Sequence, residues 1–103
     1  MKNRHFAFMY IIQNMNGGYH DDPGYFYDSQ RMDLRTDRLR QEIGYSGEGK
    51  GGMIRLATYL FDPAGYEKRL GEPFDLDRVL RCADSHNVVL AAEAIRICYE
   101  EPL

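Results

Sequence analysis

The sequence lacks an apolar run long enough to cross a membrane. The run Phe6–Ile12 is much shorter than the roughly 20 residues that a spanning helix needs. No small-residue cleavage site follows it, so it is also a poor secretion signal. We therefore expect a cytoplasmic protein with no membrane partner.

Cysteine is scarce, and a motif built on it is missing. Cys82 and Cys98 match neither a CxxC motif nor the Cys/His spacing of a zinc site. Both fall in apolar stretches of helical character, which predicts reduced, buried thiols. Internal repeats and low-complexity segments are absent as well.

An excess of positive charge is missing too. The formal net charge is -3, which argues against non-specific nucleic-acid binding over the whole surface but leaves room for a local basic stripe. With 103 residues, 44% of them hydrophobic and 28% charged, the chain has the composition of one folded domain spanning residues 1–103.

The N-terminal half divides into two expected helices. Residues 4–15 are apolar on nearly every side and end at Asn16-Gly17-Gly18, which favours a helix with a glycine stop. The Phe, Tyr and Ile content and the Asn-Gly pair leave a strand in a hairpin as the alternative. From residue 29 to 43, Met32, Thr36, Leu39 and Ile43 recur at helical spacing.

The C-terminal half shows clearer boundaries. Residues 45–52 are rich in glycine and predict a loop, and a helix over residues 53–61 should end at Asp62-Pro63. A short helix within residues 64–70 should end at Gly71, and Asp75 should cap the next helix. His86-Asn87 should break that helix before a last one over residues 88–99.

The predicted fold is therefore mainly α, a compact bundle of four to five helices, with α+β including an N-terminal β-hairpin as the alternative. The expected core consists of the large apolar residues on the inner faces of these helices. They are Phe8, Ile12, Leu39, Ile43, Ile54, Leu56, Leu60, Phe61, Leu76, Val79, Leu80, Val89, Ile95 and Tyr99.

The glycine segment carries most of a phosphate-binding motif. Residues 44–50 read G-x-x-x-x-G-K, but Gly51 takes the place of the Ser or Thr that would bind magnesium, and a charged helix precedes the motif where a buried strand is needed. Nucleotide hydrolysis is disfavoured. Gly49, Lys50, Gly51 and Gly52 stay candidates for simple anion binding at the start of the following helix, with an ordinary loop as the alternative.

Charged and aromatic residues between positions 19 and 40 supply two further candidates. Arg31, Arg35 and Arg38 would share one side of a helix and could follow a nucleic-acid backbone, although Asp33 and Asp37 lie among them. The alternative is a solvated, salt-paired face. Aromatic rings next to acidic residues could form a docking patch or pack in the core; these residues are Tyr19, Tyr25, Phe26, Tyr27 and Asp28.

Catalytic and metal-binding patterns are not evident. His20, Asp21, Asp22 and Asp28 match no calcium-loop spacing, so a solvated acidic turn is expected in place of a metal site. A Ser/His/Asp or Cys/His arrangement is not recognisable either. The expectation is a non-enzymatic protein-binding or regulatory module without a cofactor, whose partner is another protein or a second copy.

The segment Met53–Phe61 carries an Arg-Leu-Ala-x-x-Leu pattern at residues 55–60. It resembles small proteins of unknown function from bacterial phages and plasmids, in which a Gly- and Ser-containing loop precedes this helix. In those proteins a helix with an acidic start, similar to residues 74–77, follows, and then a final helix similar to residues 94–99. The resemblance lies in the residue pattern of about half of the chain. It implies a mobile-element accessory protein with an interaction role.

Overall fold

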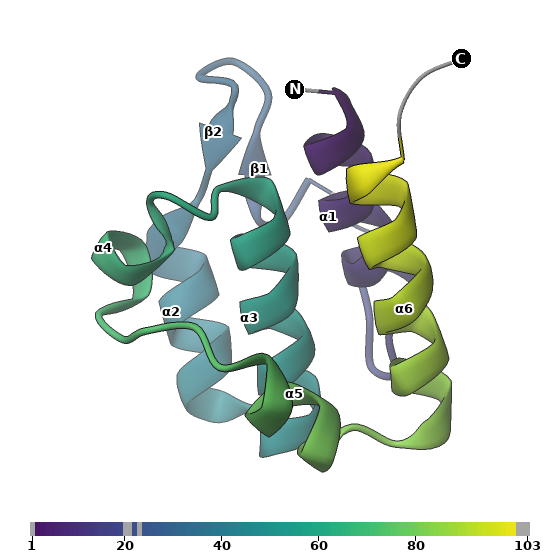
Figure 1. Cartoon of the computed structure of the whole chain (residues 1–103). Coiled ribbons are helices and arrows are strands. Elements are labelled where there is room, and N and C mark those ends of the chain that lie inside the picture. Colours follow the sequence, from purple (N-terminus) through teal and green to yellow (C-terminus); the bar gives the residue numbers. More distant parts are fainter. Residues whose placement is uncertain (1, 20–21, 23, 101–103) are drawn as a thin grey trace.

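The computed structural model describes residues 2–19, 22 and 24–100. Within them the elements follow in the order α1 (Lys2–Asn14), β1 (Tyr27–Asp28), β2 (Asp33–Leu34), α2 (Thr36–Tyr45), α3 (Glu48–Phe61), α4 (Tyr66–Leu70), α5 (Leu76–Cys82) and α6 (Ser85–Tyr99) (Figure 1). The predicted mainly α fold is confirmed. The Cα radius of gyration of 12.5 Å is close to the roughly 13 Å of a compact chain of this length.

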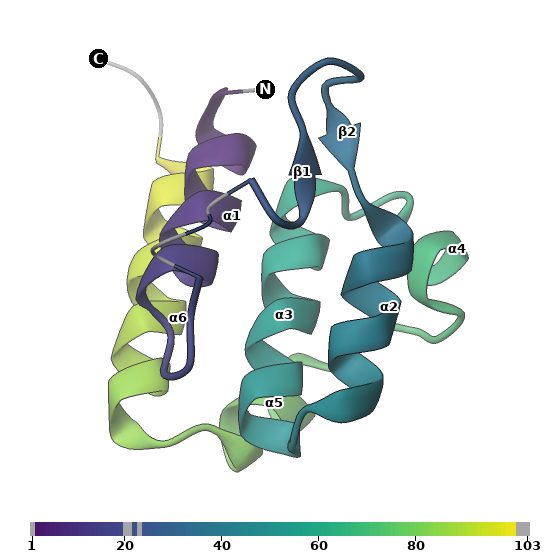
Figure 2. The ribbon, with the colours of Figure 1, turned by 180° about the vertical axis from the view of Figure 1, so that it is seen from behind.

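Helix α1 packs against both α3 and α6 and lies behind them in Figure 1. Seen from the other side in Figure 2, α1 covers part of α6, and α3 stands between α1 and α2. The helix prediction for residues 4–15 is confirmed, and the strand alternative is wrong. The buried residues of this segment recur at helical spacing, and their packing stabilises a helix even though many of its residues favour strands. They are Ala7, Phe8, Ile11 and Ile12 of α1, and Met15 directly after it.

The predicted helix over residues 29–43 is wrong in its first half. A short antiparallel hairpin pairs Tyr27 with Leu34 and Asp28 with Asp33, and α2 begins only at Thr36. The side chain of Asp28 accepts hydrogen bonds from the backbone N–H groups of Gln30 and Arg31, at 3.0 and 3.2 Å. Such local bonds offer the backbone an alternative to the helix, and here the turn prevails.

The predicted glycine loop over residues 45–52 is also wrong in its second half. Helix α3 begins at Glu48, so Gly49, Gly51 and Gly52 are helical. Glycine is a weak helix former, but it lets a neighbouring element approach closely. A Cβ atom on Gly52 would lie 3.5 Å from the Cα atom of Val79, which shows how near α5 passes. Packing against α2 and α5 therefore stabilises this helical start.

Three of the predicted boundaries are confirmed in the second half. Helix α3 ends before Asp62-Pro63, and Gly71 ends α4 in the left-handed conformation, with φ of 74°. Asp75 caps α5 by accepting a hydrogen bond from the N–H of Arg78.

The predicted break at His86-Asn87 is wrong. Helix α6 already starts at Ser85, with Asp84 as its cap accepting from the N–H of Asn87. The buried Asn87 side chain in turn accepts from the N–H of Asn16. His86 contacts the carbonyl oxygen of Asn14 as well. Asn87 and His86 therefore attach the start of α6 to the end of α1 and the residues that follow it.

The core lies between α1, α3 and α6. Of the predicted core residues, Phe8, Ile12, Leu39, Ile54, Leu56, Leu60 and Val79 are buried, and Ile43, Phe61, Leu80 and Ile95 pack against them while half-buried. The prediction is wrong for Leu76, Val89 and Tyr99, which are exposed. It is also wrong for Cys82, which is exposed, whereas Cys98 is buried as expected.

For Val89 and Tyr99 the reason is the rotation of α6. This helix turns another face towards α1 and α3, made of Asn87, Leu90, Ala91, Ala94 and Cys98.

No helix within the described residues has both the length and the apolar character needed to span a membrane.

Candidate protein-binding groove

The aromatic residues of the predicted docking patch pack mainly against each other. Phe26 is 0% exposed and belongs to the core. The half-buried rings of Tyr19 and Tyr25 stack with 5.4 Å between their centroids, and both meet Phe26 edge-on. Tyr27 packs against His5 and Phe61 on another side. The core alternative therefore holds for Phe26, and most of this aromatic surface is already in contact.

Two cations cover this aromatic pair. The Nζ atom of Lys50 lies 4.7 Å from the centroid of the Tyr19 ring, and the guanidinium carbon of Arg38 lies 4.8 Å from that of Tyr25. Arg38 also donates a hydrogen bond to the Tyr25 carbonyl. Burial raises the pKa of Tyr19, and the neighbouring Lys50 opposes that shift. Lys50 of the predicted anion site and Arg38 of the predicted arginine stripe therefore already make cation–π contacts within the protein.

The three arginines of the predicted stripe do not share one helix. Arg31 lies in the hairpin turn, Arg35 precedes α2, and only Arg38 is inside it. The carboxylate of Asp28 lies 3.7 Å from Arg35 and 3.9 Å from Arg31. The pKa of Asp28 is lowered most by the hydrogen bond from the N–H of Arg31. The hydrogen bond from the N–H of Gln30 and the two positive charges lower it further. The prediction that the three arginines share one side of a helix is wrong, and Arg31 and Arg35 are both paired with Asp28.

The predicted anion site is not a loop before a helix. Gly49, Lys50, Gly51 and Gly52 lie inside α3, and Gly51 and Gly52 are buried. The N–H of Gly51 already donates to the carbonyl of Gly47. Glu48 occupies the first turn, where its negative charge itself interacts with the helix dipole.

The acidic cluster is only partly described. His20 and Asp21 lie outside the described residues, whereas Asp22 is exposed and Asp28 belongs to the hairpin. In the described part of the chain, His, Cys, Asp and Glu side chains form no group of three that could hold a metal ion.

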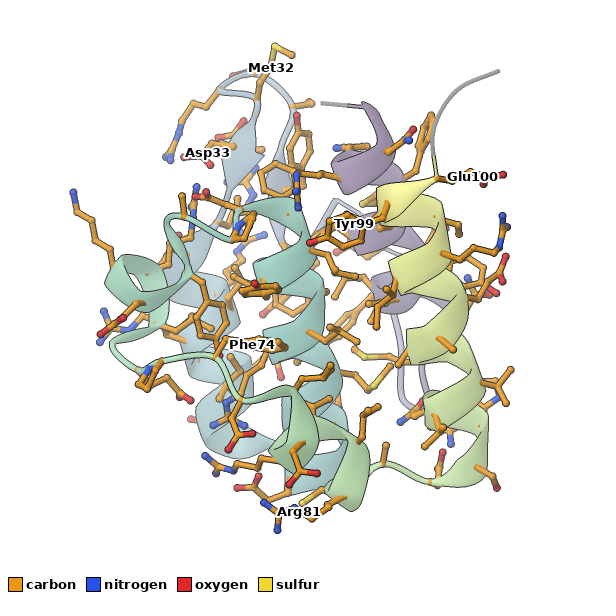
Figure 3. The ribbon with its side chains drawn as sticks, in the orientation of Figure 1. Met32, Asp33, Phe74, Arg81, Tyr99 and Glu100 are labelled. Atoms are coloured by element: carbon orange, nitrogen blue, oxygen red, sulfur yellow. The ribbon has the colours of Figure 1, made fainter. Side chains whose placement is uncertain are left out.

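An apolar groove opens on the side of α3 and α6 that faces away from α1. It encloses about 180 Å³, and every lining residue is uncharged. Figure 3 shows Phe74 and Tyr99 on this face, with the ring of Tyr99 directed from α6 towards α3. The groove is lined by Leu56, Tyr59 and Leu60 of α3, Phe74 and Leu76 at the start of α5, and Ile95 and Tyr99 of α6.

Stacked aromatic rings form one wall of the groove. The rings of Tyr59 and Phe74 stack with 4.1 Å between centroids and an angle of 14°, and Tyr66 meets both edge-on. Burial raises the pKa of Tyr66 to about 12, with the charge of Glu72 acting in the same direction. The wall is therefore built of rings that pack against one another within the protein itself.

Ile95 and Tyr99, on the outer face of α6, form the other wall. Val88, Ala92, Ile95 and Tyr99 follow at intervals of four, three and four residues, so they form one stripe along the helix. We call these four residues the α6 stripe. Val88 is 40% exposed and Tyr99 55%, and Ala92 is exposed as well. On the side of α1, the guanidinium of Arg4 lies 5.3 Å from the Tyr99 ring and donates to the Leu60 carbonyl.

Comparisons of the chain with protein-family models, curated proteins and solved structures gave no match. The resemblance to phage and plasmid proteins therefore stays a prediction.

From the sequence, several residues of the groove are predicted to lie in the core. One signal pointed to the groove: α6 is apolar on two faces, because the α6 stripe lies beside the core face of Leu90, Ala94 and Cys98. A surface helix with a single buried face has a narrower apolar arc. An apolar arc that is too wide for one packing partner predicts a second partner, but the sequence alone does not tell which face meets which.

Proposed function

We propose that this protein is a non-enzymatic protein-binding module, and that its groove between α3 and α6 binds an apolar helical segment. The observation that carries the proposal is the groove itself, an uncharged cavity of about 180 Å³ with Leu76 and Tyr99 exposed at its edges. Large apolar side chains left in contact with water on a small protein are typical of interaction surfaces. Binding would remove these side chains from water.

The length of the α6 stripe, which extends beyond the groove, favours a helix as the ligand. The α6 stripe runs from Val88 to Tyr99, which corresponds to roughly 16 Å or three helical turns. An amphipathic helix places apolar residues at i, i+3 or i+4, and i+7, and can lay that face into such a groove. The aromatic wall, built of rings that already pack against one another, lowers the entropy that binding would cost.

The earlier candidates receive less support from the geometry. The rings of Tyr19 and Tyr25 are covered by Lys50 and Arg38, and Phe26 has no exposed surface to offer. The pairing of Arg31 and Arg35 with Asp28 leaves little free positive charge for a phosphate backbone.

The proposal can be tested by selecting short random peptides from a display library on the full chain. Selected peptides should carry apolar residues at helical spacing, because the groove is uncharged and elongated. Leu76→Glu should weaken their binding at least about tenfold, since it places a charge on the exposed edge of the groove. Binding can be measured by fluorescence polarisation.

A matched control is Gln41→Glu. Gln41 is also exposed and helical, but it lies on α2 and does not line the groove, and the substitution adds the same side chain and charge. Binding to this variant should be unchanged. Peptides that bind the two variants equally well, or a selection that enriches no apolar helical peptide, would contradict the proposed function.

A further inference from the structure

We infer that the segment that fills the groove is α6 of a second copy of this chain, with the two α6 stripes packed antiparallel around a two-fold axis. This inference rests on the proposed function and specifies its partner. Each copy would then insert the same stripe into the groove of the other, which is the self-complementary arrangement that a two-fold dimer requires.

The spacing of the α6 stripe is symmetric. The intervals of four, three and four residues are the same in both directions, with the midpoint between Ala92 and Ile95. An axis through that midpoint places Val88 opposite Tyr99 of the partner subunit, and Ala92 opposite Ile95 of the partner subunit. Each contact then joins a smaller side chain to a larger one, which is how packed helix layers interdigitate.

Charge complementarity favours the same orientation. Glu93, Arg96 and Glu100 run along the exposed flank of the α6 stripe, and Arg96 pairs with both carboxylates within its own helix. In the antiparallel register, Arg96 comes within reach of Glu93 of the partner subunit, and the same pair repeats across the axis.

The groove walls accommodate this packing. Ala92 is small and exposed, so two helix axes can approach to the 8–10 Å usual for packed helices. The opposite α6 would lie beside Phe74 and Leu76, which line the groove from the other side. Leu76 is 39% exposed. Val89, 70% exposed next to the stripe, would be covered by the alkyl part of Arg96 of the partner subunit.

Sedimentation equilibrium over a range of concentrations tests the inference. The unmodified chain should form a dimer, and Ala92→Glu should raise its dissociation constant at least about a hundredfold, because it places a charged side chain in the apolar contact with Ile95 of the partner subunit. Gln41→Glu should leave the constant unchanged. Circular dichroism should show the same helix content and cooperative unfolding for both variants, since both positions are exposed.

Disulfide cross-linking tests the orientation. In a Cys82→Ser background, which removes the exposed native thiol, a mixture of Ala92→Cys and Ile95→Cys chains should form mixed disulfide dimers under mild oxidation. Ala92→Cys alone should cross-link much more slowly, because the two copies of position 92 are offset along the axis. Faster cross-linking of Ala92→Cys alone would indicate parallel helices and overturn the inference.

The outcomes for the two proposals can be told apart. A chain that stays monomeric at its highest soluble concentration, or a dimer that Ala92→Glu does not weaken, overturns pairing through the α6 stripe. If helical peptides still bind the groove of such a chain, the proposed function stands with a different partner. If peptide binding also fails, both proposals fail.

Discussion

The helical start of α3 makes a specific prediction about stability. If residues 48–52 form the first turn of a helix, replacing both Gly51 and Gly52 by alanine should stabilise the protein. In a loop with glycine-specific geometry the same double substitution would do the opposite. The experiment therefore distinguishes the helix of the structure from the loop that the glycine content predicts.

The magnitude follows from the local geometry. Alanine is favoured over glycine in a helix interior by about 0.8–1.0 kcal/mol per residue, so the pair should contribute roughly 1.5–2 kcal/mol. A Cβ on Gly52 would make ordinary contacts with Val79, the nearest atom being 3.5 Å away. A Cβ on Gly51 would meet first the end of the flexible Arg55 side chain, at 3.4 Å. No contact offsets the gain.

Urea and thermal unfolding followed by far-UV circular dichroism measure the effect. One kcal/mol shifts the Tm of a small domain by roughly 4–8 °C, so the double variant should melt about 6–16 °C higher. Gly71→Ala is the control, because Gly71 has a φ of 74°, where alanine costs about 1–2 kcal/mol. A double variant that is less stable than the unmodified chain, or no different from it, would refute a helical backbone at these glycines.

Two further predictions concern the core and the response to acid. Phe26→Ala should lower the free energy of unfolding by about 3–5 kcal/mol in urea titrations, because the ring is 0% exposed; a loss below about 1 kcal/mol would argue against a core position. The hydrogen bond from Arg78 holds the pKa of Glu48 below its usual value, so the stability that Glu48 contributes is present above its unfolded pKa and is lost as the pH falls through the folded pKa. Unfolding midpoints in urea at neutral and acidic pH should therefore differ less for Glu48→Gln than for the unmodified chain, and an equal difference would show that this ion pair does not contribute.

Local sequence signals determined several elements of this protein by themselves. Asp62-Pro63 ends α3 because the residue before proline avoids helical geometry, and Gly71 ends α4 because it adopts a positive φ without strain. Asp75 caps α5 with a hydrogen bond that spans only three residues. These signals act within a few residues, so the sequence alone reveals them.

Tertiary packing decided the remaining features. The glycines of residues 49–52 are helical because Val79 and its neighbours pack against them, and that contact joins positions far apart in the chain. Helix α6 is apolar on two faces, and only its packing against α1 determines that Leu90 and Ala94 are buried while Val88 and Tyr99 stay exposed. The groove exists because α3 and α6 each pack against α1 and against each other, a relation between three helices that no local pattern in the sequence encodes.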